Sequence, residues 1–282
     1  MIKIFLLTFL LNSEETWNRV DTSHFNVFFE GKWQIPNIAI DLERIYNLMN
    51  FNLSYFAPWM KNEKTNIYIY SSYENYLKGR FSPPKWSKGL SLVNKKTVVV
   101  YNTVKKDQLI PTITHELTHL YFESFFNQKL KRPPLWLNEG LAVYMEDDSY
   151  QDEHLWNKAL RYSPKTSYLK FEIFFKTDLN SIKNDNDIAN WYLQSYGIVR
   201  YLIEKNKIAF YKMCSDILNS KKIEKALWDN YRIIDSDDFE KKWFYWLSEI
   251  TSGKKENKIE FKPFKRIEFK YLNSHSFRHY DI

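Results

Sequence analysis

Residues 115–119, His-Glu-Leu-Thr-His, contain side chains that could bind a metal ion and activate water. Residues four apart lie one turn above each other on the same face of a helix, so His115 and His119 can hold one ion between them. Glu116 lies one step round that helix. It is close enough to reach a water molecule on the ion but poorly placed to ligate beside both imidazoles. That position suits a general base.

A second carboxylate with the right chemistry follows in the segment Trp136-Leu137-Asn138-Glu139-Gly140. Catalytic zinc usually takes three protein ligands and leaves its fourth position to water. Glu139, with nineteen residues between it and His119, is the candidate third ligand. The cofactor that this set predicts is one Zn²⁺.

The pentapeptide alone is insufficient evidence for a metal site, because such a pattern arises by chance in roughly one chain in a hundred. The residues around it provide further evidence. A single Glu on a helix is also commonly a solvated surface residue. Here the segment from Leu109 to Phe126 has apolar residues at helical spacing and is predicted to be a partly buried helix. Leu135 to Met145 is a second apolar, helix-like segment, and Gly140 would let two helix backbones approach closely. This context favours a metal site.

With H-E-L-T-H followed by P-L-W-L-N-E-G-L-A-V-Y, the sequence resembles the gluzincin metallopeptidases, whose third zinc ligand is a glutamate on a second helix. It is most similar to the peptidase MA-like domain family, and W-L-N-E-G also resembles the aminopeptidase branch. The similarity of layout covers about residues 24–250, although only the two motifs are highly specific. It implies an α+β, zincin-like catalytic domain in which a small mixed sheet carries the active-site helix and a mainly helical subdomain follows. It also implies a zinc-dependent peptidase acting on peptides or proteins.

Residues 190–202 resemble the segment that follows the glutamate helix in peptidase MA-like proteins, where a tyrosine faces the zinc. Attack of water on a carbonyl creates an oxyanion, which a neutral hydroxyl donor can stabilise. Tyr192 and Tyr196 are four apart and share a helix face, so both are candidates, and Tyr192 is preferred. Ordinary aromatic packing in a tyrosine-rich helix explains these residues equally well.

Hydrophobic patterning predicts the elements that must position these residues. The predicted strands are His24–Glu30, Thr65–Tyr70 and Lys96–Tyr101, the predicted helices are Ile38–Phe56 and Tyr73–Lys78, and Arg80–Lys88 is predicted to be a loop. In gluzincins the last strand commonly borders the cleft, which suggests that Thr97–Tyr101 offers an open edge to the substrate backbone. A plain interior strand fits the sequence as well.

These elements divide the catalytic unit into an α/β subdomain, 24–127, and a helical subdomain, 128–250, with the metal at their junction. Residues 1–13 are predicted to be a signal peptide and the protein to be exported, because the uncharged stretch Ile4–Leu11 is too short to span a bilayer. A buried N-terminal strand is the alternative. Residues 251–282 form a basic C-terminal extension.

Composition narrows the possible functions further. The 282 residues are 44% apolar, enough for one substantial domain or two small ones that share a cleft. Cys214 is the single cysteine, which excludes internal disulfides and cysteine-based zinc sites. No segment has the length of a transmembrane helix.

Three functions are compatible with these observations. An endopeptidase is favoured over an aminopeptidase, because the G-x-M-E-N sequence with which the aminopeptidase branch holds a free amine is missing. One alternative is a proteolytically silent zincin-fold interaction module, against which the intact Glu116 argues. The other is a basic polyanion-binding protein, suggested by the net charge of +7. The acidic residues that interrupt the basic extension argue against nucleic acid as a partner.

Overall fold

The computed structural model describes residues 17–31, 37–85, 87–102, 106–150 and 154–252. The predicted signal peptide, 1–13, lies outside these residues, as does the predicted basic extension beyond Ser252. Within the described ranges, none of the helices combines the length and the apolar character needed to cross a membrane.

A five-stranded mixed sheet forms the first part of the molecule, with strand order β1-β2-β3-β5-β4. The strands are β1 (Trp17–Asp21), β2 (Phe25–Glu30), β3 (Thr65–Tyr70), β4 (Gly89–Leu92) and β5 (Thr97–Tyr101). The three central strands run parallel, and β1 and β4 pair antiparallel at the two edges. Sequence patterning predicted β2, β3 and β5 to within a residue at each end but missed both edge strands.

The central strands are buried because their two faces pack against different sets of side chains. On β5, Val98 and Val100 belong to the main hydrophobic core, whereas Val99 packs with Tyr70 and Tyr76 on the opposite face. Side chains alternate between the faces of a strand, so a strand covered on both sides is a continuous apolar run. The helices over this region are α1 (Ile38–Leu53) and α2 (Tyr73–Lys78).

The predicted open edge at Thr97–Tyr101 is wrong. This strand, β5, pairs in parallel with β3 on one side and antiparallel with β4 on the other, so both of its edges are hydrogen-bonded. The outer position belongs instead to β4, which covers only four residues. Its sequence, Gly-Leu-Ser-Leu, is short and begins with a glycine, which has no side chain to pack, so it gives no clear strand pattern.

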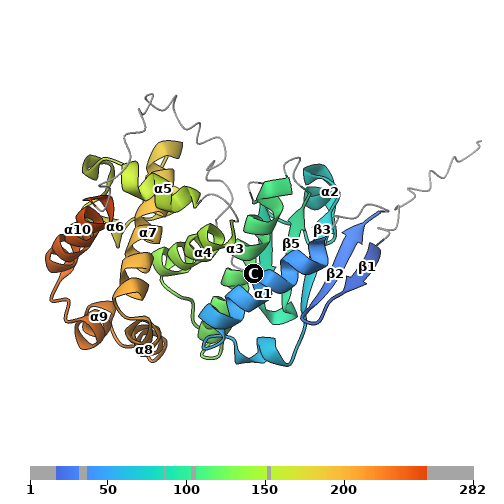
Figure 1. The fold of residues 1–282 in the computed structure, drawn as a ribbon, viewed down its shortest axis with the longest axis horizontal. Helices are drawn as coiled ribbons and strands as arrows, with labels where there is room; N and C mark the ends of the chain where they lie inside the picture. The colour runs from blue at the N-terminus through green and yellow to red at the C-terminus, as the bar shows by residue number, and fades with distance from the viewer. Residues whose placement is uncertain (1–16, 32–36, 86, 103–105, 151–153, 253–282) are drawn as a thin grey trace, which may run out of the picture.

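Within the described residues, every strand precedes α3 (Lys106–Asn127), and the longer elements after it are helices. They are α4 (Leu135–Ser149), α5 (Leu155–Tyr162), α6 (Phe171–Phe174), α7 (Asp185–Lys205), α8 (Lys207–Leu218), α9 (Ile223–Tyr231) and α10 (Ser236–Ser252). Figure 1 shows the sheet on one side, the later helices on the other, and α3 and α4 side by side between them. This arrangement confirms the predicted α+β class.

One hydrophobic core runs through both parts of the molecule. It extends from Phe25 on β2 to Leu247 on α10 and includes Leu117 on α3 and Leu141 on α4. The division into subdomains at 127/128 therefore follows a change in secondary structure, although the core is shared across it; as a domain boundary it stays a prediction.

Candidate metal centre

Two neighbouring helices bring the three predicted ligands to one point. His115 and His119 come from consecutive turns of α3, and Glu139 comes from the second turn of α4. The Nε2 atoms of the two histidines are 3.1 Å apart. Glu139 Oε2 lies 3.7 Å from His115 Nε2 and 3.6 Å from His119 Nε2. All three side chains are buried, Glu139 completely.

This geometry fits a tetrahedral metal ion. An ion with ligands about 2.0–2.2 Å away in tetrahedral directions holds them roughly 3.3–3.6 Å from one another. The three distances in this cluster, 3.1, 3.6 and 3.7 Å, lie close to that range. Two imidazole nitrogens and a carboxylate oxygen are all electron-pair donors, and burying them together is costly unless a cation is shared between them. The chemistry of the donor atoms and the distances between them therefore both fit a bound metal ion.

The electrostatic field at the centre favours positive charge. Burial works against the imidazolium form of His119, but the Glu139 carboxylate outweighs this and raises the pKa of His119 to about 10. Burial likewise opposes protonation of His115, and its interactions with Glu139 and Glu146 nevertheless raise its pKa. A metal cation would gain from the same carboxylates that stabilise a proton here.

Glu116, the predicted general base, is 5% exposed and lies against the edge strand β4. A Cβ atom built on Gly89 would be 2.5 Å from Glu116 Cγ and 2.7 Å from its Oε1. Since real Cβ atoms do not approach other heavy atoms so closely, the absence of a side chain at Gly89 makes room for this carboxylate. No sequence pattern indicates this contact, because the two positions are 27 apart along the chain.

The two candidate tyrosines on α7 are in different surroundings, although both are buried. Tyr196 donates its hydroxyl hydrogen to Asp147 Oδ2 at 2.9 Å and accepts a hydrogen bond from Arg200 at 3.3 Å. Tyr192 packs edge-to-face on Trp191. The hydroxyl of Tyr196 is thus engaged in a hydrogen-bond network with Asp147 and Arg200, and the preference for Tyr192 as oxyanion donor stays a prediction.

Gly140, next to the predicted third ligand, lies where α4 and α7 pack closely together. A Cβ atom at this position would collide with the backbone carbonyl oxygen of Ser195 and with the side chain of Val199. The close approach of helix backbones predicted at Gly140 is confirmed. It fixes the distance between the Glu139 helix and the helix that carries the two tyrosines.

A family model of the peptidase MA superfamily matches residues 57–249, which include the strands from β3 onward, α3, α4 and most of the helical part. The chain belongs to the peptidase MA superfamily. No curated protein sequence matches it significantly. Membership of the peptidase MA superfamily supports a metallopeptidase that acts on proteins or peptides, and the buried histidine–glutamate cluster is compatible with its metal site.

Two further charged residues adjoin this peptidase MA centre and were not identified from the sequence. Glu146 of α4 contacts the imidazole of His115. Lys88, just before β4, is half-buried; burial lowers the pKa of its ammonium group, which the nearby Glu146 carboxylate partly offsets. No motif marks either residue, since their distance from the centre depends on how α4 and β4 pack against α3.

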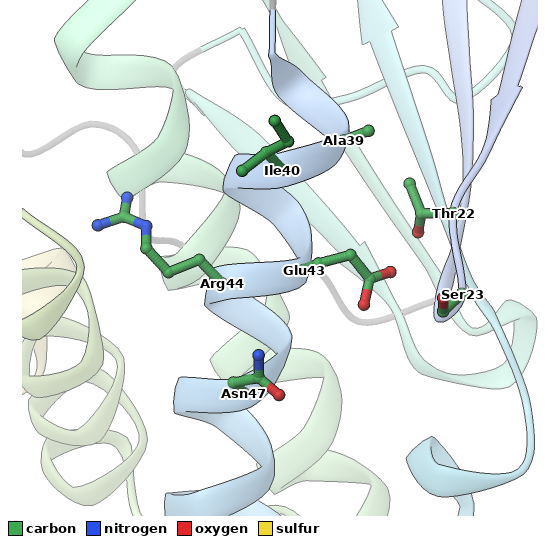
Figure 2. A pocket seen from close by; sticks show the side chains of 7 residues that line it. All are labelled: Thr22, Ser23, Ala39, Ile40, Glu43, Arg44 and Asn47. Atoms are coloured by element: carbon green, nitrogen blue, oxygen red, sulfur yellow. The ribbon is translucent and has the colours of Figure 1, made fainter.

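A separate shallow pocket lies between the β1–β2 turn and α1 (Figure 2). It is lined by Thr22, Ser23, Ala39, Ile40, Glu43, Arg44 and Asn47. The carboxylate of Glu43 already bonds to the backbone N–H and to the ring of His24. The pocket includes none of the predicted ligands, and its one carboxylate serves to hold the turn before β2.

Proposed function

We propose that the protein is a zinc-dependent endopeptidase. The observation that carries this proposal is the convergence of His115, His119 and Glu139 from two helices, with the Glu116 carboxylate near enough to act electrostatically on His119. Membership of the peptidase MA superfamily supports the same chemistry. The preference for endopeptidase over aminopeptidase rests on the missing G-x-M-E-N sequence.

Zinc suits this donor set better than a hard cation does. Two imidazoles and one carboxylate are typical of catalytic zinc, whereas calcium and magnesium prefer sites made of oxygen ligands. When bound, zinc would lower the pKa of a coordinated water toward ~7 and polarise the scissile carbonyl.

The side chains around the ligands supply the remaining steps. Glu116 would take the proton from the attacking water and pass it to the leaving amine, as a general base and then a general acid. Glu116 is buried on α3 and packs against Gly89, and this contact would hold its carboxylate in one position. Tyr192 would donate a hydrogen bond to the oxyanion that forms on the substrate.

Strand β4 is the candidate binding edge for the substrate backbone. It is the outermost strand on the side of the sheet where Gly89 contacts Glu116. An extended peptide added to this edge would be held by backbone hydrogen bonds that need no particular substrate sequence. A broad range of unfolded protein substrates is therefore expected.

The substitution Glu116→Gln tests the proposal. It removes the base but none of the three ligands, so the variant should keep one zinc per chain and lose roughly 10²–10⁴-fold in the rate of hydrolysis. Metal analysis and cleavage of a labelled, unfolded protein measure the two properties on the same sample. Unchanged hydrolysis would rule out the assigned role of Glu116.

The alternative of a silent interaction module makes a different prediction for the wild-type protein. It would bind zinc in full yet cleave no member of a broad peptide library. The polyanion-binding alternative depends on the basic extension, which lies almost wholly outside the described residues. Export likewise remains a prediction from residues 1–13.

A further inference from the structure

We propose that Glu146 is a positioning residue that orients His115 for metal binding, an inference that rests on the proposed function. Its Oε2 atom lies 2.9 Å from His115 Nδ1, at hydrogen-bond distance. His115 is 2% exposed, so water does not compete for this nitrogen to any large extent. The contact joins α4 to the His115 ring, whose other nitrogen, Nε2, faces His119 and Glu139.

The chemistry of imidazole gives this contact its function. A neutral imidazole carries its hydrogen on one ring nitrogen and a lone pair on the other. A carboxylate that accepts the hydrogen bond from Nδ1 fixes the hydrogen there, leaves the Nε2 lone pair available for a metal and makes that nitrogen more basic. Nε2 is the atom of His115 that lies 3.1 Å from His119 Nε2 and 3.7 Å from Glu139.

The Glu146 side chain is itself held on both oxygens. Its Oε1 atom is within 3.4 Å of the Trp156 indole nitrogen and 3.5 Å of the Tyr150 hydroxyl. Trp156 is fixed in turn, because the neighbouring Asp147 accepts hydrogen bonds from the backbone N–H groups of Trp156 and Asn157 at the start of α5. Such a carboxylate loses little conformational freedom when it orients the imidazole.

Helix α4 thus supplies both a ligand and the group that orients another ligand. Glu139 and Glu146 are seven residues apart, which places them two turns apart on the same face of the helix. The corresponding carboxylate near His119 is more distant: Glu123 Oε1 lies 4.0 Å from His119 Nδ1 and accepts a hydrogen bond from Asn138. The contact of Glu146 with His115, at 2.9 Å, is therefore the shorter of these two carboxylate–imidazole contacts.

Zinc affinity of the full-length protein, measured by competition with a chromophoric chelator, tests the inference. Glu146→Ala should weaken zinc binding 10–100-fold, the range found when such partners are removed. Glu146→Gln keeps an oxygen that can accept the hydrogen bond, so its loss should be smaller. Asp148→Asn, two residues further along α4, is the matched control for loss of one negative charge and should bind zinc as the wild type does.

A spectroscopic signature separates orientation from a general loss of stability. In the zinc-loaded wild type, the His115 Nδ1–H proton should give a strongly downfield NMR resonance, which moves upfield in Glu146→Gln because the acceptor becomes neutral. Thermal unfolding of the chelated variants controls for folding. Wild-type zinc affinity in Glu146→Ala, or an unshifted resonance in Glu146→Gln, would overturn the inference while leaving the proposed function intact. A wild-type protein that binds no zinc would overturn the proposed function itself.

Discussion

The position of a single side chain, Glu116, depends on a residue that has none. Gly89 on β4 packs directly on the Glu116 carboxylate, and a Cβ atom there would occupy space that Cγ and Oε1 now fill. Neither residue is a metal ligand in the proposed site. The contact should therefore affect the proton-transfer step and leave the ligands in place.

The substitution Gly89→Ala tests this contact by adding a single methyl group. It should displace Glu116 and slow hydrolysis about 10²-fold, since a shift of about 1 Å in a catalytic group has this effect. Zinc content should stay at one per chain.

Gly31→Ala is the matched control. Gly31 has a φ of 72° and nothing within 4 Å of an added Cβ, so its replacement should cost only about 1–2 kcal/mol of backbone strain. Activity per folded molecule should stay at the wild-type level in this control. Equal activity in Gly89→Ala and the wild type would contradict the role given to Gly89.

At the scale of elements, α4 organises the centre because its faces meet different partners. Glu139 and Glu146 point toward α3, where they contact the two histidines. Gly140 points toward α7 and lets the helices touch through their backbones. A helix with nearly every side chain buried has little amphipathic pattern, and α4 lacks a clear polar face over Trp136–Val143.

Gly140→Ala should destabilise the protein, although the same change on an exposed helix stabilises it by about 1 kcal/mol. The added methyl group meets the backbone carbonyl of Ser195, which cannot move without shifting α7, so a loss of roughly 1–3 kcal/mol is expected. In Gly197→Ala the nearest atoms belong to the side chains of Leu160 and Trp243 rather than to backbone and lie farther away, at 2.8 and 2.9 Å, so this change should cost less. Urea unfolding measures the free energy of unfolding of both variants. A Gly140→Ala variant more stable than the wild type would disprove the close packing of α4 against α7.

At the scale of the whole molecule, the proposed metal site joins the sheet-bearing part to the helical part. Its ligands come from α3 and α4, on either side of the connection at residues 128–134. Other ties cross between the same parts: Lys207 and Tyr211 of α8 donate hydrogen bonds to the backbone carbonyls of Phe51 and Asn52 at the end of α1. With a shared core as well, the molecule should unfold in a single transition.

Removal of metal should lower the stability of the whole molecule. A ligand that binds only the folded state adds about 4 kcal/mol when its free concentration is about 1,000 times its Kd. Thermal unfolding with added zinc and with a chelator should therefore give clearly different midpoints for the wild type. His119→Ala should show one midpoint under both conditions, and a wild type that is insensitive to the chelator would argue against a metal at this position.

The sequence by itself determined the local part of the centre. The spacing of His115, Glu116 and His119 acts through helix geometry, which depends on a few neighbouring residues, and the helix predicted at Leu109–Phe126 agrees closely with α3. Glu139 was identified because W-L-N-E-G is a specific motif on a second apolar helix. Strands β2, β3 and β5 were visible through their alternating or continuous apolar residues.

Only the tertiary structure decided which strand lies at the sheet edge, which carboxylate contacts His115 and which side chain packs against Gly89. Each of these depends on contacts between segments far apart in the chain, and such contacts leave no period or spacing in the sequence. A four-residue strand such as β4 is recognised only once β5 is present to pair with it. Likewise, Tyr192 and Tyr196 share a helix face in the sequence pattern, and only the structure shows that Tyr196 donates a hydrogen bond to Asp147 of another helix.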